Sequence, residues 1–416
     1  MSDESTSTLG DLLRRRSVRS LLLSRVCASS GSVTLAIAMG VFVFDRTGRE
    51  LDIAWVGIAE FLPTFLLVLY AGSLADRLDR RFMAAIAYAV QALIAFGMAW
   101  YVVTGLDAVW PLFLLTAMYG TARGFANPPS RALPANVVAE VDLPRLIPAL
   151  ATMWQMAAVF APLISSALYG INPAWTFVAI AVLDVVAAIA IAQVKLHAPQ
   201  QRSGERPTFT AALDGLRLVR RTPLLLAAIG LDLFAVLLGG VVALAPPITE
   251  QLLGAPSQAS FWMRSAGGLG AALTALYLAR RPIERGVGRS LLIAVATFGV
   301  LTIGIAFSRS LALTLCLFAA LAAADMVSVF VRATIVPLAT PDTLRGRVLA
   351  VEAVFIGASN ELGAFESGLT AELFGLVPAI VISGVATLVV VAVFAVAVPD
   401  LRRLDRFSEI GRSAPG

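Results

Sequence analysis

Residues 72–81 of the chain read Gly72-Ser73-Leu74-Ala75-Asp76-Arg77-Leu78-Asp79-Arg80-Arg81, with five charged residues in the last six positions. Two long apolar runs, 53–75 and 82–104, flank this charged segment. A helix needs about 20 mostly apolar residues to cross the hydrocarbon core of a bilayer, and each run is long enough. The stretch therefore predicts a short polar loop between two membrane-spanning helices.

The composition of the whole chain extends this interpretation. Of 416 residues, 58% are hydrophobic and only 14% are charged, with a mean hydropathy of +0.84. Soluble globular proteins are closer to half apolar and a quarter charged. The composition excludes a water-soluble enzyme, a disordered scaffold and a disulfide-stapled secreted domain. The two cysteines, Cys27 and Cys316, both lie in apolar runs and are predicted to be small buried side chains rather than a disulfide.

Apolar runs of this length recur along the chain, and they predict an all-α membrane protein with twelve spans. The predicted spans are 20–44, 53–75, 82–104, 109–130, 146–170, 173–194, 223–247, 257–279, 290–308, 311–336, 347–371 and 377–398. The short alternating segments of a membrane β-barrel do not occur, so helices are the remaining way to satisfy the backbone in lipid.

The basic residues of the loops predict the orientation of the spans. Twenty-five Arg and Lys residues fall on one side of the predicted spans, and three, Arg46, Arg49 and Arg309, fall on the other. Positively charged loops remain in the cytoplasm. We therefore expect both termini and the central connector to be cytoplasmic. The Arg-rich, Lys-poor composition suggests a high-GC bacterial source, and we expect the protein in the bacterial plasma membrane.

A polar connector at 195–222 divides the chain into two halves of similar length. The predicted organisation is an N-terminal segment 1–19, a six-helix bundle 20–194, the connector, a second six-helix bundle 223–398 and a tail 399–416. Arg131-Ala132-Leu133-Pro134 is echoed about 200 residues later by Arg332-Ala333…Pro337. Parallel repeats of this kind place a substrate site at the interface between the two bundles.

The loop at 72–81 resembles the signature G-x-L-a-D-r-x-G-r-k of the major facilitator superfamily, which that family carries between its second and third spans. The matching residues are Gly72, Leu74, Asp76, Arg77, Arg80 and Arg81, whereas Asp79 replaces the usual Gly. The resemblance implies twelve helices in two pseudo-symmetric bundles. It also implies a cytoplasmic gate in which Asp76 faces the helix end near Arg345 and Arg347. The alternative is an ordinary positively charged cytoplasmic loop.

Two further resemblances favour the exporters of this superfamily. Ala161-Pro162-Leu163-Ile164-Ser165-Ser166 in the fifth span is similar to the exporter element G-P-x-x-G-G, with Pro162 retained and Ser165 and Ser166 in place of glycines. Between Asp325 and Pro399 the chain resembles the drug and siderophore exporter branch that includes the bacterial enterobactin exporter.

Charged residues within the spans are the candidates for function, because ionisable groups at membrane depth are costly. The proton-coupling candidates are Asp232, Glu361 and Asp325. The substrate-cavity candidates are the charged Arg25, Glu60, Arg123 and Arg264, together with the uncharged Gln155 and Phe234. Asp184, Arg332, Glu352 and Glu366 complete the set of charges in the spans. The alternative for each acid is a static ion pair with an arginine in a span.

These features together predict a secondary transporter that exports small amphipathic molecules by proton-coupled alternating access. A uniporter, an importer or a lipid flippase with the same fold remains open as an alternative. The only lysine, Lys195, follows a valine, so the Walker A lysine of an ATP-driven pump is missing. We expect no enzyme activity, no cofactor, no metal site around the only histidine, His197, and no nucleic-acid partner. The chain is expected to work as a monomer.

Overall fold

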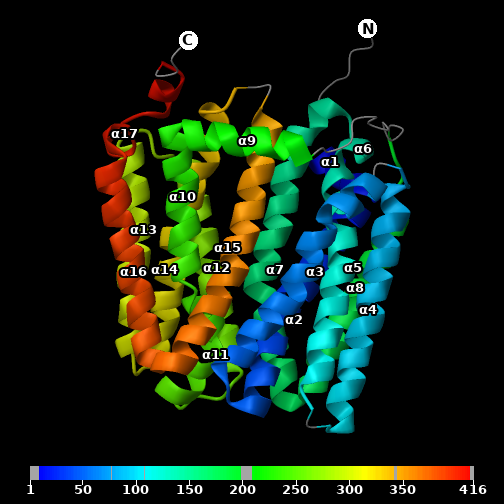
Figure 1. Cartoon of the computed structure of the whole chain (residues 1–416). Coiled ribbons are helices and arrows are strands. Elements are labelled where there is room, and N and C mark those ends of the chain that lie inside the picture. Colours follow the sequence, from blue (N-terminus) through cyan, green and yellow to red (C-terminus); the bar gives the residue numbers. More distant parts are fainter. Residues whose placement is uncertain (1–8, 76, 107, 198–208, 342–343, 413–416) are drawn as a thin grey trace. The chain divides into compact units, whose positions relative to one another are not determined.

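The computed structural model describes residues 9–75, 77–106, 108–197, 209–341 and 344–412. Within these residues the chain is helical and contains no strand (Figure 1). Asp76, the proposed gating acid, lies outside the described residues.

In the part of the chain that the structure describes, eight helices precede the connector, together with a 3₁₀ turn at Glu140–Asp142. They are α1 (Leu9–Arg14), α2 (Arg16–Thr47), α3 (Glu50–Ala75), α4 (Arg80–Thr104), α5 (Trp110–Ala132), α6 (Pro134–Val137), α7 (Leu143–Ile171) and α8 (Pro173–Ala192). Prolines at the first turns of α6, α7 and α8 help to begin these helices, since proline lacks an N–H that would be unpaired there anyway.

The rest of the chain forms a second set of helices. They are α9 (Phe209–Arg221), α10 (Pro223–Leu238), α11 (Ala245–Pro247), α12 (Ala259–Arg280), α13 (Val287–Phe307), α14 (Leu311–Leu338), α15 (Arg345–Phe374), α16 (Leu376–Ala397) and α17 (Pro399–Arg403). Helix α9 lies within the connector, where the sequence predicted only polar chain. A Cβ on its Gly215 would lie 2.9 Å from the carbonyl oxygen of Arg347, so α9 packs directly on the start of α15.

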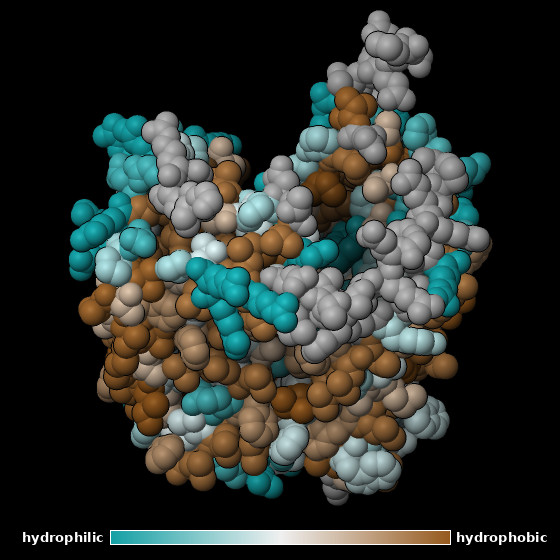
Figure 2. Space-filling view, turned by 45° about the horizontal axis from the view of Figure 1, so that its top comes forward, coloured by the Kyte–Doolittle hydropathy of each residue, from teal (hydrophilic) through white to brown (hydrophobic). Residues whose placement is uncertain are grey.

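Among the described residues, nine stretches are long and apolar enough to cross a membrane. They comprise α2, α4, α7, α8, the stretch Pro223–Leu252 and α13 to α16. The long helices α3, α5 and α12 complete the order of the twelve predicted spans. Large apolar side chains stay exposed along the helices, as for Leu93 and Trp100 of α4 at 72% each. Figure 2 shows apolar residues over the helix flanks and hydrophilic residues toward the helix ends, as lipid contact requires.

The seventh span is not the continuous helix that the run 223–247 predicted. Helix α10 ends at Leu238, and the chain continues through a 3₁₀ turn (Val241–Leu244), α11 and a π-helical turn (Ile248–Leu252). Gly239 and Gly240 weaken the helix here, and Pro246 and Pro247 donate no backbone hydrogen bond. Helix α15 also comes close at this point, because a Cβ on Gly240 would lie 2.4 Å from the carbonyl oxygen of Gly363.

The contacts divide the chain into two compact units. Unit 1 holds 1–46 and 56–207, and unit 2 holds 47–55 and 208–416. In unit 1, Tyr119 and Phe177 are among the largest fully buried side chains, and Phe177 packs edge-on against Phe42. In unit 2, Phe261 is likewise among the largest fully buried side chains. The segment 47–55 is tied to unit 2 by an ion pair between Arg49 and Glu372 at 3.4 Å.

Candidate functional site

A buried cluster of three charged residues lies inside unit 2. Arg332 of α14 contacts the carboxylate of Asp232 on α10, and its Nε lies 3.1 Å from Oε1 of Glu352 on α15. The three side chains are between 6% and 10% exposed. One guanidinium therefore bridges carboxylates from two other helices at membrane depth.

The charges in this cluster do not balance. Two carboxylates face one guanidinium, so the fully ionised set carries a net charge of −1 inside the helix bundle. Burying an excess charge is costly, and binding one proton would remove it. The cluster is thus suited to take up and release a single proton.

A second acid lies close to the cluster. Asp232 and Asp325 line the same small cavity of about 10 Å³, which also contains Ser328. A cavity of this size is close to the lower limit for one water molecule. The hydroxyl of Ser328 is buried without a hydrogen-bond partner among the described residues, so polar capacity remains unused here.

The three predicted proton-coupling acids do not all lie in one cluster. Asp232 and Asp325 share the small cavity, whereas Glu361 of α15 interacts electrostatically with Arg264 of α12. Arg332 and Glu352 were predicted only as charges within spans. The offset of 100 residues between Asp232 and Arg332 carries no signal of contact, because only the packing of α10, α14 and α15 brings them together.

Unit 1 holds a separate ion pair made by two substrate-cavity candidates. Arg123 Nη1 of α5 lies 2.5 Å from Oε1 of Glu60 on α3. The helices touch beside it, since a Cβ on Gly120 would lie 2.0 Å from the backbone oxygen of Glu60. Thr64 Oγ1 donates to the carbonyl oxygen of Gly120 at 2.6 Å. This geometry matches the alternative of a static ion pair between an acid and an arginine in a span.

Asp184 is a fully buried acid to which the sequence analysis assigned no role. It lies on α8, and its Oδ2 accepts a hydrogen bond of 2.9 Å from the hydroxyl of Tyr119 on α5. Its Oδ1 has no hydrogen-bond partner among the described residues. A Cβ on Gly31 of α2 would lie 3.0 Å from this oxygen, so three helices enclose the carboxyl group. The feature of the sequence that could have marked Asp184 for a role is that it is a single acid in an otherwise apolar span.

The signature loop begins α4 with a cap. Asp79, the departure from the usual Gly, accepts a hydrogen bond of 2.9 Å from the backbone N–H of Arg81. The Arg81 guanidinium also donates to both carboxylate oxygens of Asp79, at 3.1 Å and 2.6 Å, and this hydrogen bonding lowers the pKa of Asp79. Arg81 reaches the carbonyl oxygen of Val194 at 2.9 Å, and Arg80 donates to Asn136 Oδ1 at 2.9 Å. The loop is thus anchored to α6 and to the end of α8.

Replacing Asp79 with alanine is expected to lower the stability of the protein by about 1 kcal/mol at neutral pH, because an N-cap and an ion pair are both lost. Asp79→Ser keeps a cap oxygen and should lose less. Since the folded-state pKa of Asp79 is lowered, its stabilisation is complete above about pH 4, the ordinary pKa of aspartate, and disappears as pH falls through the folded-state pKa. Thermal unfolding in detergent at neutral and acidic pH measures this. Equal melting temperatures of wild type and Asp79→Ala at neutral pH would contradict the cap.

Other predicted residues have varied surroundings. A Cβ on Gly72 would meet no described atom within 4 Å. Arg77 is exposed within the loop, and Arg345 Nε lies 3.4 Å from the carbonyl oxygen of Pro337. Pro162 lies inside α7, where Ser165 Oγ shares a hydrogen bond of 2.9 Å with Thr34 Oγ1 of α2.

The remaining candidates are more open. Gln155 of α7 is half-buried, and Phe234 of α10 is 42% exposed with its ring 6.5 Å from that of Phe394. Arg25 of α2 lines a cavity in unit 1 together with Arg131. In the described residues, no cluster of three or more His, Cys, Asp or Glu side chains is arranged to bind a metal ion.

The fold is shared with known membrane transporters. A nucleoside transporter, NupG, superposes with a TM-score of 0.74 at 14% identity, over 91% of this chain and 98% of that chain. A bacterial homologue of the human lysosomal transporter Spinster, in an inward-facing and occupied conformation, gives a TM-score of 0.72 at 13% identity, over 91% and 96%. These superpositions show that the chain has the fold of multi-pass membrane transporters.

Sequence similarity places the chain within this class. The family described as "Transmembrane secretion effector" matches residues 6–412. The multidrug efflux pump Tap of Mycolicibacterium fortuitum is 26% identical over 94% of this chain and 97% of that protein. An uncharacterised MFS-type transporter of Bacillus subtilis, YfiS, is 22% identical over 65% of each chain. The chain belongs to the major facilitator superfamily, in its efflux branch, and has the superfamily's fold of twelve spans.

Proposed function

We propose that this transporter exports small amphipathic molecules from a bacterial cytoplasm across the plasma membrane, in exchange for protons. Export is supported by the relative Tap, a multidrug efflux pump that matches along nearly the whole chain. The exporter-like residues Pro162, Ser165 and Ser166 in α7 point the same way.

The observation that supports proton coupling is the unbalanced cluster of Arg332, Asp232 and Glu352. A proton on one carboxylate makes the buried set neutral, and release of that proton restores its negative charge. Asp325, which lines the small cavity together with Asp232, provides a second group through which the proton can pass. Proton binding and release would then favour different conformations of the transporter.

The rest of the mechanism follows alternating access. Two bundles, 20–194 and 223–398, rock about a substrate cavity that includes Glu60, Arg123 and Arg264. The signature loop, through Asp76 and Arg77, meets Arg345 and Arg347 in one conformation and separates from them in the other. Both termini and the connector are cytoplasmic, and a single chain is the working unit.

The test is transport in proteoliposomes with the dyes ethidium, Hoechst 33342 and rhodamine 6G as probes. Asp232→Asn and Glu352→Gln should each reduce dye flux driven by a pH gradient by about tenfold or more, because the charge that needs a proton is removed. Exchange of dye across the membrane without a gradient should persist. Glu366→Gln is the matched control, since this acid of α15 bonds to Thr370 at 2.8 Å, outside the cluster.

Two outcomes would overturn parts of the proposal. Full gradient-driven flux in both cluster variants would show that the proton binds elsewhere. Wild-type exchange that does not respond to a pH gradient would favour the uniporter alternative.

A further inference from the structure

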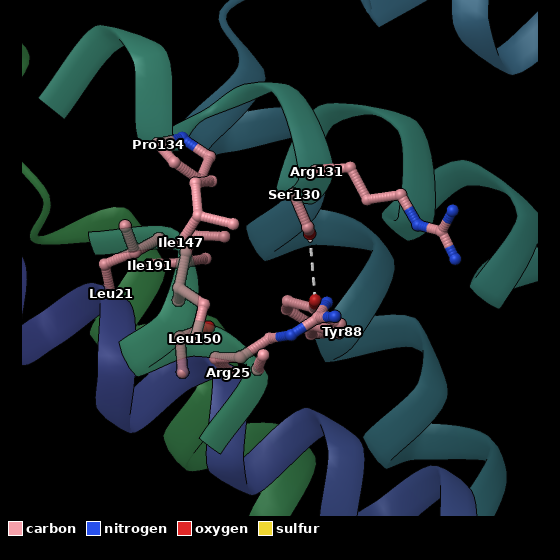
Figure 3. Close-up of a pocket in the computed structure, with 11 residues that line it drawn as sticks. Leu21, Arg25, Tyr88, Ser130, Arg131, Pro134, Ile147, Leu150 and Ile191 are labelled. Atoms are coloured by element: carbon pink, nitrogen blue, oxygen red, sulfur yellow. Dashed lines mark hydrogen bonds between the residues drawn. The ribbon is translucent and has the colours of Figure 1, made fainter. Parts of the chain in front are cut away.

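A cavity of about 210 Å³ lies inside unit 1, between α2, α4, α5, α7 and α8. It is separate from the cluster around Arg332, which belongs to unit 2. Figure 3 shows Arg25 and Tyr88 on one side of it, and Leu21, Ile147 and Ile191 on the other.

The charge in this cavity is positive and uncompensated. Arg25 and Arg131 both line it, and none of the other lining residues is acidic. Neither guanidinium makes a hydrogen bond or an ion pair with any residue that the structure describes. Arg25 lies on a membrane-spanning helix, where an arginine normally finds an anionic partner. The cavity therefore presents two guanidinium groups to which an anionic ligand could bind.

The hydroxyl groups in the wall cannot provide further donors. Ser130 Oγ donates to the carbonyl oxygen of Ala126 at 2.7 Å, so in the 2.9 Å bond between Tyr88 and Ser130 the donor is Tyr88. Ser24 Oγ donates to the carbonyl oxygen of Ala187 at 3.0 Å. All three hydroxyl protons are in use, and the guanidinium groups remain as the donors available to a ligand.

The opposite wall is apolar and determines the rest of the ligand. Leu21, Ile147, Leu150, Pro134 and Ile191 form it. The volume is below the roughly 300–1,000 Å³ of pockets that hold a drug-sized molecule. It therefore suits an anionic head group with a short apolar portion.

We propose that this cavity binds an amphipathic anion, with a carboxylate or phosphate on Arg25 and an apolar chain along the Leu21–Ile147–Leu150 wall. Arg25 is the main anchor, because Figure 3 shows the guanidinium of Arg131 pointing away from the apolar side chains. The anion has two sources with the same chemistry: an acidic phospholipid, or a soluble organic anion that the protein transports. The proposed anion binding at this cavity holds whether the protein exports or imports its substrate.

The test is binding of a fluorescent fatty acid, 11-(dansylamino)undecanoic acid, to the purified full-length protein in neutral detergent. The carboxylate should bind wild type about tenfold or more tightly than the matching alcohol or amine, since a charge-assisted hydrogen bond is gained. Arg25→Gln should bring the carboxylate down to the affinity of the alcohol. Arg25→Lys should retain part of the difference, and Arg131→Gln should have a smaller effect.

The control is Arg19→Gln, which removes one positive charge from an exposed position of the same helix, outside the cavity. It should bind the carboxylate as wild type does. Equal binding of the carboxylate, the alcohol and the amine by wild type would overturn the proposal, whether or not Arg25→Gln folds. Unchanged carboxylate affinity in a folded Arg25→Gln would also overturn it.

A second measurement separates the two sources of the anion. Wild type is placed in phosphatidylcholine nanodiscs with or without phosphatidylglycerol, and the fatty-acid probe is titrated. Competition by phosphatidylglycerol identifies the ligand as a lipid of the membrane. Competition by soluble octanoate but not by phosphatidylglycerol identifies it as an organic anion in solution. Failure of both to compete would show that the probe does not occupy an anion site.

Discussion

Replacing Arg332 with glutamine is expected to abolish gradient-driven transport and to destabilise the protein by about 3–5 kcal/mol, the usual cost of removing one partner from a buried ion pair. Asp232 and Glu352 would then face each other without a cation, at side-chain exposures of 8% and 10%. Like charges held close in a buried site repel strongly. Thermal unfolding in detergent and dye transport in proteoliposomes measure the two effects.

Two further variants serve as comparisons for Arg332→Gln. Arg280→Gln removes the same charge from the exposed end of α12 and should change stability little. The double variant Arg332→Gln/Asp232→Asn should recover part of the lost stability, because one of the unpaired carboxylates is gone, but it should not recover proton-driven transport. A melting temperature of Arg332→Gln equal to that of wild type would mean that the cluster is not formed in the protein.

Replacing Gly120 with alanine is expected to destabilise unit 1 by about 3 kcal/mol or more, at the upper end of overpacking effects. Its Cβ would lie 2.0 Å from the backbone oxygen of Glu60, and a backbone atom cannot move aside as a flexible side chain can. Moving α3 away would also break the hydrogen bond from Thr64 to the Gly120 carbonyl and the ion pair between Glu60 and Arg123. Transport should fall together with the melting temperature.

A graded series tests this packing argument. Gly124 also faces α3, but its Cβ would lie 3.3 Å from Thr64 Cα, so Gly124→Ala should be milder. Gly97 of α4 has its nearest neighbour at 3.8 Å, and Gly97→Ala should be neutral or slightly stabilising, because alanine favours a helix over glycine. If all three variants melt at the same temperature, α3 and α5 are not in direct backbone contact.

Much of the fold was predictable because lipid leaves the backbone few choices. Apolar length alone placed the spans, and helix α8 (Pro173–Ala192) falls inside the predicted span 173–194. The structure of the seventh span was harder to predict. Its hydropathy is continuous from Pro223 to Leu252, yet α10 ends at Leu238, because two glycines and two prolines weaken the helix where α15 comes close.

The candidate site was predictable only in its parts. The sequence marked Asp232, Asp325 and Glu361 as acids at membrane depth, but it did not show which arginine lies beside which acid. Glu352, not among the predicted proton-coupling acids, shares Arg332 with Asp232. Similarly, Asp79 replaces the usual glycine of the signature, and nothing in the sequence explained this replacement. The structure shows that Asp79 caps the start of α4.

The sequence by itself determined that this protein is a helical membrane protein with charges placed in its spans, because hydropathy and charge act locally along the chain. The tertiary structure alone decided which of those charges neutralise one another and which remain uncompensated. Pairing depends on side chains from helices far apart in sequence, such as α10 and α14 at Arg332, or α2 and α5 around the cavity of Arg25. Contact between such residues is a result of helix packing, and no pattern within a single helix encodes it.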